Sequence, residues 1–529
     1  MPRPERAWTR GLRASAPAGA ALVIAALYAH HVARWNFLGD DAFISFRYAR
    51  HLVEGHGLTW NPGERVEGYT NFLWVLLLAG GMRLGIDPET FSRGLGIVSG
   101  TAVLVLAGWF ASRRFGARTV VAFLPPALLA SNRSFAAWST GGLETMFFTL
   151  LAFAGLIAFL VERERNLRWP IASSLLLAAA TLTRPDGALF VLPLGVLFLV
   201  DVVRGTRSLR TALVWAAPYA LIVGAHLAWR HAYYGFWAPN TFYAKVPGLR
   251  WERGLRYLSL FHEDYGVLWL LPLGVLSLAL RRDAVPWLLF GTIALQVVYL
   301  AAVGGDRFEF RLLVSVLPPL YLWLADGTHR LAEIARGGRF GRLGQVAVAC
   351  LVGTLLLGMT HAGSMRPEAR AERFEVASVE GVAFYGRHRA RQGRILRAWI
   401  RRGLLPRDVI LATGGAGAVP YYTGWTTVDY RGLNDLVVAR TPIDRIGQVA
   451  HERRAPLSYL RKRRVEIFDV ARLSLVVRDL PKKYLRPWRY NEFKGKLRVL
   501  KIGKRHLVFA TFLSKRTFRR RFGHLDIVQ

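Results

Sequence analysis

Residues 39–71 read GDDAFISFRYARHLVEGHGLTWNPGERVEGYTN, and this acidic, aromatic stretch decides how the rest of the chain is interpreted. It directly follows an apolar run near residues 14–37, which is long enough to cross a bilayer. Apolar residues from Phe43 to Leu52 recur at helical spacing, which predicts an amphipathic helix lying on the membrane surface. The stretch therefore indicates a loop that leaves the first span and stays close to the lipid.

Apolar runs of similar length continue through two thirds of the 529 residues, of which 53% are hydrophobic. Short turns rich in arginine separate them, and a bilayer-crossing helix needs about 20 apolar residues. We expect about eleven spans, near 14–37, 93–112, 119–137, 141–161, 169–184, 185–203, 210–230, 264–281, 284–303, 311–326 and 343–362. The fold class predicted is a polytopic α-helical membrane protein.

The arginine-rich turns set the expected orientation. They recur on alternate connections and agree with the basic N-terminus, so the positive-inside rule places them in the cytoplasm. Residues 71–86 would make a short extra span that reverses this pattern, and we therefore expect a second interfacial helix there. No small-residue cleavage site follows the first run, which favours a retained anchor over a cleaved signal peptide.

The composition of the sequence changes after residue 362, where the long apolar runs end. Residues 363–529 contain 37 basic and 14 acidic residues, and the segment 408–422 reads as a buried strand followed by a glycine-rich turn. We expect residues 1–362 to form the membrane domain, with its outer loop at 38–92, and residues 363–529 to form a basic, mixed α/β domain outside the membrane. The net charge of +36 is spread over topological turns and this tail, so we expect no nucleic-acid partner.

Asp40 and Asp41 are the strongest candidates for chemistry. One aspartate is enough to cap a helix, and two adjacent carboxylates repel each other, which raises the pKa of one of them toward a value useful for a base. Capping and catalysis remain open on these two residues alone. A divalent metal is possible between them but is not predicted, and no cofactor is required. The single cysteine, Cys350, excludes an internal disulfide.

Further polar residues gather at the expected outer ends of helices. They are Glu144 in STGGLET, Arg184 and Asp186 in TRPDG, Asn240, Tyr243 and Lys245 in APNTFYAKVPG, and Asp306, Arg307 and Arg311 in GGDRFEFR. Each is more simply an interfacial anchor, but all are expected on the side that holds Asp40. Together they predict a cavity with carboxylates on one wall and cations on another, and cations suit a phosphate.

The first-loop string DDAFISFRYARHLVEGHGLTWNPGERVEGYTNFLW resembles that of the GT-C superfamily of membrane glycosyltransferases. It looks most like the actinobacterial terminal β-(1→2)-arabinofuranosyltransferases of cell-wall arabinan and their bacterial relatives. The strings WSTGGLET, TRPDG, PNTFYAK, GGDRFEFR and ATGGAGAVPYYTGWTTVDYRGLND are similar to further strings of that group. The resemblance covers most of residues 38–450.

The resemblance implies an inverting glycosyltransferase. Such an enzyme moves a sugar, here arabinofuranose-like, from a polyprenyl-phosphate donor to a cell-envelope glycan or glycolipid on the outer face of the inner membrane. Carried onto this chain, it implies Asp40 as the base and Asp41 as an orienting residue. It implies Lys245, Arg311 and Arg307 for the donor phosphate, and Glu67, Tyr69, Asn240, Asp306, Arg184 and Asp186 for the sugars.

Three other classes fit a polytopic chain less well. A flippase or transporter for a lipid-linked sugar is the main alternative, but transporters often contain inverted repeats, and none is evident here. A polysaccharide polymerase or ligase of another family concentrates its polar residues in a late loop, whereas the densest polar signal here is early. A membrane scaffold leaves the paired aspartates unexplained.

Overall fold

The computed structural model describes residues 7–117, 119–245, 248–280, 283–366, 376–443, 451–470, 474–485, 488–490, 493–495 and 497–528. The chain forms two compact units that alternate along the sequence. Unit 1 comprises residues 1–37, 92–226 and 249–380, and unit 2 comprises residues 38–91, 227–248 and 381–529. Most of the first outer loop therefore belongs to the same unit as the C-terminal residues. The domain boundary at residue 362 stays a prediction.

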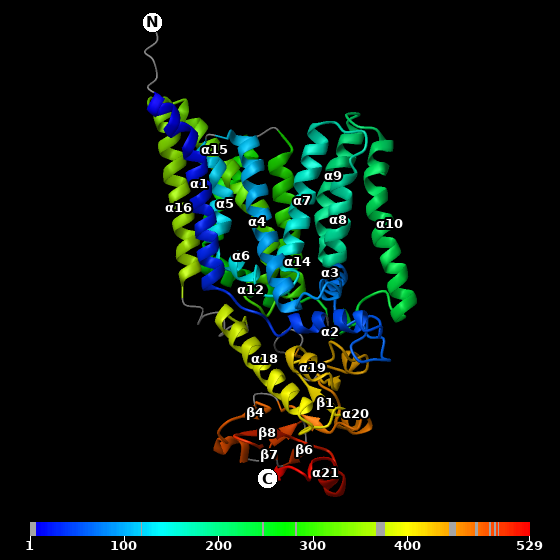
Figure 1. The fold of residues 1–529 in the computed structure, drawn as a ribbon. Coiled ribbons are helices and arrows are strands. Elements are labelled where there is room, and N and C mark those ends of the chain that lie inside the picture. The colour runs from blue at the N-terminus through cyan, green and yellow to red at the C-terminus, as the bar shows by residue number, and fades with distance from the viewer. Residues whose placement is uncertain are drawn as a thin grey trace. The chain divides into compact units, whose positions relative to one another are not determined.

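Unit 1 is built from helices, most of which run alongside one another (Figure 1). They are α1 (Ala7–Arg34), α4 (Pro88–Phe115), α5 (Val120–Ser131), α6 (Arg133–Trp138), α7 (Thr145–Glu164), α8 (Ile171–Thr183), η1 (Pro185–Gly187), α9 (Ala188–Val203), α10 (Leu209–Tyr234), α12 (Trp251–Tyr265), α13 (Val267–Leu280), α14 (Val285–Val303), η2 (Arg311–Val316), α15 (Leu317–Arg336) and α16 (Gly341–Met365). The first residues of α4 and the last of α10 are counted with unit 2.

Helices lie in every segment that the sequence predicts to span the membrane, but not all of them are long and apolar enough to be complete spans, so the number of about eleven spans stays a prediction. Among the described residues, six helical segments are long and apolar enough to cross a bilayer: α4, α7, Pro185–Val203, α10, α14 and α16. The bent pair α12 and α13 forms a seventh if it counts as one span, while α5 and α8 are shorter apolar helices. Apolar side chains such as Val105, Leu199 and Leu221 point outward from these helices, which suits a lipid environment. The chain is therefore a multi-pass membrane protein.

Unit 2 combines the outer loop with the C-terminal residues. Its helices are α2 (Ala42–Val53), α3 (Phe72–Arg83), α11 (Asn240–Lys245), α18 (Val379–Arg401), α19 (Ala418–Thr423), η3 (Val438–Arg440), α20 (Leu457–Lys462), η4 (Lys482–Leu485) and α21 (Lys515–Phe522). Its strands are β1 (Ile410–Thr413), β2 (Thr426–Asp429), β3 (Ile467–Phe468), β4 (Val476–Val477), β5 (Trp488–Tyr490), β6 (Phe493–Gly495), β7 (Arg498–Ile502), β8 (Arg505–Phe509) and β9 (Asp526–Ile527).

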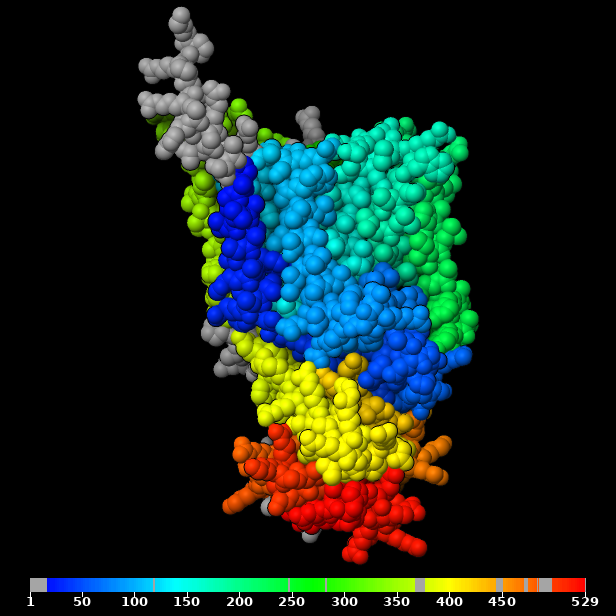
Figure 2. All heavy atoms as spheres, viewed as in Figure 1, coloured from blue at the N-terminus to red at the C-terminus, as the bar shows by residue number. Residues whose placement is uncertain are grey.

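The strands of unit 2 form a parallel sheet of order β2-β1-β3, an antiparallel sheet of order β4-β8-β7-β9, and the hairpin β5-β6. Alternate residues of β1 face opposite sides, so Leu411 packs with Leu396 of α18 and Leu500 of β7, while Ala412 packs with Val428 and Phe468. Figure 2 shows α18, in yellow, on the surface of this part of unit 2. The mixed α/β character predicted for the C-terminal region is confirmed.

The two helices expected in the outer loop are present as α2 and α3, which pack against each other. Most residues of α2 are buried, including Phe43, whose ring lies 5.5 Å from those of Tyr421 and Tyr422. Local periodicity predicts the helix correctly but misses what covers it, because the covering residues lie far along the chain. The interfacial position of both helices stays a prediction.

Candidate active site

Asp40 lies just before α2, and its carboxylate is held by backbone amides from the glycine-rich turn that follows β1. The N–H of Ala418 donates to Oδ1 at 2.8 Å, and the N–H of Gly417 donates to Oδ2 at 3.2 Å. The side chain is buried, with 4% of its surface exposed. Each carboxylate oxygen has two lone pairs, so each retains one that can accept a further hydrogen bond.

Burial raises the pKa of Asp40 above its ordinary value. The charge of Arg389 and the two amide N–H groups act in the opposite direction, and the neighbouring Asp41 adds a smaller increase. The sequence predicts a raised pKa here from carboxylate repulsion, but desolvation is the larger cause. A carboxylate with a raised pKa accepts a proton more readily, which suits a general base.

The turn that holds Asp40 has no room for a larger residue. A Cβ atom at Gly417 would lie 1.9 Å from the carbonyl oxygen of Asp40 and 2.6 Å from its Cγ. Gly386 of α18 is equally close to the preceding segment, since its Cβ would lie 2.2 Å from the carbonyl oxygen of Leu38. Backbone contact on two sides therefore fixes the position of Asp40 within unit 2.

Asp41 occupies the N-cap position of α2, but its side chain makes no capping hydrogen bond to that helix. It is partly exposed, in contrast to Asp40. The carboxylate of Asp40 instead accepts from the first amides of α19, about 377 residues further along, so neither carboxylate caps α2. The pair combines one buried, fixed carboxylate with one that solvent can reach.

A buried ion pair supports the turn next to Asp40. Arg389 of α18 lies 2.8 Å from Asp469, which also accepts a hydrogen bond of 2.7 Å from the hydroxyl of Thr413 at the end of β1. The guanidinium of Arg389 further donates to the carbonyl oxygen of Gly415 at 3.3 Å. Arg389 thus places a positive charge near Asp40 while fixing the glycine-rich turn.

Glu67, Tyr69 and Asn240 lie in unit 2 and tie its segments together. Glu67 forms a buried ion pair of 2.8 Å with Arg230, and the hydroxyls of Tyr69 and Tyr234 lie 3.1 Å apart. Burial raises the pKa of Glu67 to about 7, although the charge of Arg230 opposes this. The amide of Asn240 donates to the carbonyl oxygens of Gly432, Leu433 and Asp435. Their contact with sugar stays a prediction.

The predicted residues of unit 1 form two internal pairs. Arg184 binds Asp186 through two hydrogen bonds of 3.0 and 2.7 Å, and Arg311 binds Asp306 at 2.8 Å. Arg307 is half-buried beside this second pair, and its backbone N–H donates to Asp306 at 2.8 Å. Lys245, at the end of α11, belongs to unit 2. The residues predicted to bind the donor phosphate thus come from both units.

A buried charge network in unit 1 was not predicted from the sequence. Arg133 of α6 lies 2.9 Å from Glu309 and 2.7 Å from Asp264, and the hydroxyl of Ser134 donates to Glu309 at 3.0 Å. Glu309 lies within the quoted string GGDRFEFR, so the signal available was a charged residue next to an apolar span. The turn 414–418 was also not assigned to the site from the sequence. The available signal was its glycine content, because glycine-rich turns with free N–H groups commonly hold anions.

Curated relatives match part of this chain. It is 29% identical over 341 residues to a terminal β-(1→2)-arabinofuranosyltransferase of Mycobacterium tuberculosis, covering 55% of this chain and 52% of the relative. It is 27% identical over 348 residues to the enzyme of the same name from Corynebacterium glutamicum, covering 56% and 49%. The chain thus spans about half the length of these relatives. Residues 383–510 match a family model described as a domain of unknown function (DUF8728).

Solved structures match more of the chain. ArnT of Cupriavidus metallidurans bound to undecaprenyl phosphate aligns with a TM-score of 0.51 and 16% identity over 77% of this chain and 84% of ArnT. The chain has the fold of ArnT. The apo form of ArnT agrees, with a TM-score of 0.51 and 17% identity over 78% and 85%. The predicted resemblance and the GT-C-like fold class are confirmed. Among the described residues of this ArnT-like fold, no group of three or more His, Cys, Asp or Glu is arranged to hold a metal.

Proposed function

We propose that this protein is an inverting glycosyltransferase that uses a polyprenyl-phosphate sugar as donor. The observation that carries the proposal is the buried carboxylate of Asp40, which two backbone amides fix and whose pKa is raised. The ArnT-like fold and the names of the curated relatives support the reaction class. An arabinofuranose-like sugar is the donor group that those names favour.

In the proposed reaction the carboxylate of Asp40 accepts the proton of the acceptor hydroxyl. The hydroxyl oxygen forms a bond to the anomeric carbon of the donor, and the bond from that carbon to the phosphate oxygen breaks with inversion. The electron pair leaves with the polyprenyl phosphate. Lys245, Arg307 and Arg311 would stabilise the charge of this leaving group, and Asp41 would orient the acceptor.

The remaining sugar contacts would come from the other polar residues that the sequence singles out. Glu67, Tyr69 and Asn240 are candidates in unit 2, and Asp306, Arg184 and Asp186 are candidates in unit 1. The acceptor would be a cell-envelope glycan or glycolipid at the outer face of the inner membrane. In this topology the N-terminus is cytoplasmic and the C-terminal residues are extracytoplasmic, as the arginine-rich turns favour.

Sugar transfer in purified membranes tests the proposal. Radiolabelled polyprenyl-phosphate arabinofuranose is supplied to membranes holding matched amounts of wild type, Asp40→Asn and Asp41→Asn. Loss of the general base lowers transfer by about 10²- to 10⁴-fold in Asp40→Asn. Donor binding should persist in that variant, because the base contacts the acceptor.

Two outcomes contradict the proposal. Full transfer in both variants removes the carboxylates from the chemistry. If the wild type transfers no sugar from any lipid-linked donor and instead moves such lipids across the bilayer, the protein is a flippase.

A further inference from the structure

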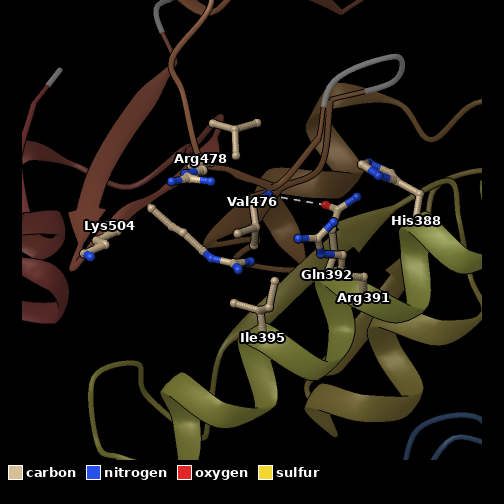
Figure 3. Close-up of a pocket in the computed structure, with 9 residues that line it drawn as sticks. His388, Arg391, Gln392, Ile395, Val476, Arg478 and Lys504 are labelled. Atoms are coloured by element: carbon tan, nitrogen blue, oxygen red, sulfur yellow. Dashed lines mark hydrogen bonds between the residues drawn. The ribbon is translucent and has the colours of Figure 1, made fainter.

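Unit 2 contains a cavity of about 350 Å³ between α18 and one edge of the antiparallel sheet (Figure 3). Side chains from α18 and from the strands and turn opposite it reach into this space. The lining residues are His388, Arg391, Gln392, Ile395, Val476, Val477, Arg478, Lys504 and Arg505. No carboxylate is among them, so the cavity is strongly positive.

The four cations of this cavity, Arg391, Arg478, Lys504 and Arg505, make no ion pair within the described part of the chain. Like charges gathered around one cavity repel each other, and a bound anion would relieve that repulsion. Guanidinium and ammonium groups bind carboxylate and phosphate through charge-assisted hydrogen bonds. The charge of the lining therefore favours a ligand with an oxyanion.

Gln392 supplies a second, independent observation. Its side chain is 3% exposed, and its Oε1 accepts a hydrogen bond of 3.3 Å from the backbone N–H of Val476, drawn as a dashed line in Figure 3. Its Nε2 is buried and has no hydrogen-bond partner among the described residues. A buried donor without an acceptor is unfavourable, and a ligand oxygen that reached this atom would satisfy it.

A second cavity, of about 400 Å³, adjoins the first and shares His388 and Gln392 with it. Two more buried donors, Nε of Arg389 and Nε of Arg431, belong to residues of its lining and have no hydrogen-bond partner in the part of the chain that the structure describes. The exposed rings of Phe384 and Tyr385 also line it. Aromatic faces next to N–H donors suit the apolar faces and the oxygens of a sugar.

The second cavity reaches the turn that holds Asp40. Gly414 and Gly415 line it, and Gly417 in the same turn donates its N–H to the Asp40 carboxylate. We call the two cavities, which share His388 and Gln392, the groove; its second part is lined by glycines of the turn that holds the candidate base. A chain of sugars fits such a groove better than a single small anion, because the polar contacts extend over two adjoining cavities.

We propose that this groove binds an anionic glycan, with a carboxylate or phosphate group of the glycan in the cationic cavity and a neighbouring sugar against Phe384 and Tyr385. The binding itself is independent of any reaction. That the glycan is the acceptor rests on the proposed transferase function. The site would then select acceptors that carry a negative charge a short distance from the hydroxyl to be modified.

Binding to the full-length protein in nanodiscs of neutral lipid tests the proposal. The probes are glucuronate, glucose 6-phosphate and glucose, measured by calorimetry. We expect the two anionic sugars to bind more tightly than glucose. The double variant Arg478→Gln/Lys504→Gln should weaken their binding about tenfold, since two charge contacts are lost. Gln392→Met should weaken all three sugars alike, because it removes a donor without changing charge.

Arg401→Gln/Arg402→Gln is the matched control, because Arg401 ends α18 and Arg402 follows it, and both are exposed and line neither cavity. If the control and the test variant lose equal affinity for the anionic sugars, the effect comes from the overall positive charge, and the proposed site is wrong. Binding of vesicles that contain anionic lipid, with no binding of anionic sugars, would identify a lipid headgroup instead. Transfer that fails while anionic sugars still bind would contradict the proposed function alone.

Discussion

The proposed reaction depends on the buried carboxylate of Asp40. Two backbone amides and the nearby Arg389 stabilise its charged form, while burial opposes that charge. Backbone donors keep their direction better than side chains do, so the carboxylate is positioned before a substrate arrives. Changes to the turn should therefore alter the rate of transfer more than they alter donor binding.

Gly417→Ala tests this positioning. The added methyl group would lie 1.9 Å from the carbonyl oxygen of Asp40, so either the turn or Asp40 must move. We expect kcat to fall by about 10²-fold, because a misplacement of about 1 Å has effects of that size. The control is Gly80→Ala in α3, where a Cβ meets nothing within 4 Å. Unchanged kcat in Gly417→Ala, measured by sugar transfer, would show that the amide contacts do not position the base.

The pH dependence of transfer follows from the raised pKa of Asp40. A base works only when deprotonated, so the rate should rise with pH through this pKa, at values above the ordinary range of an aspartate. Arg389 lowers that pKa, so Arg389→Gln should move the rise to higher pH, and Arg389→Lys should restore it. If the pH–rate profile is identical in all three proteins, Arg389 does not influence the pKa of the base.

Single elements are anchored by buried charges as well as by apolar contact. The short helix α6 depends on Arg133, which is 1% exposed and bound by both Glu309 and Asp264. Phe310, next to Glu309, has a φ of 36°, which an L-residue rarely adopts, so the surrounding contacts must hold it there. The network thus fixes how the chain enters η2, whose N-cap residue is Phe310.

Arg133→Met should destabilise unit 1 strongly. Removing one partner leaves the buried charge of Glu309 uncompensated, which costs about 3–5 kcal/mol in buried pairs. Thermal unfolding in detergent should show a lower Tm, and Arg133→Met/Glu309→Gln should recover part of the loss. If the double variant is less stable than the single one, the network does not act as a charge pair.

Local sequence patterns predict the helices and strands of this molecule but not how they divide into two units. Helical periodicity finds α2, and the strand followed by a glycine-rich turn at 408–422 is confirmed as β1 and the turn before α19. Asp40 can be identified as a candidate from the adjacent Asp41 and from the family resemblance. Its partners Gly417 and Ala418 cannot be identified in this way, because a contact across about 377 residues leaves no periodic signal in the sequence. The same reason explains why Arg133 and Glu309 were missed.

Within unit 2, Arg47, a fully buried residue of α2, joins the first outer loop to the segment around α19 and β2. Its guanidinium donates to the carbonyl oxygens of Trp60, Pro420 and Trp425 at 2.8 to 2.9 Å. Arg47→Met would leave these acceptors unpaired, and hydrogen exchange at α19 and β2 should become faster. Arg83→Met, on the exposed side of α3, is the matched control. Equal exchange in both variants would mean that other contacts hold the segments together.

The distance in sequence between Asp40 and its amide donors has a consequence for biosynthesis. A ribosome makes Asp40 first and Gly417 only after about 377 more residues. Until then the carboxylate lacks the two amide N–H groups that fix it. Nascent or prematurely terminated chains would therefore occupy the membrane with this carboxylate unfixed, so that only a chain translated past its glycine-rich turn acquires the positioned base that we propose.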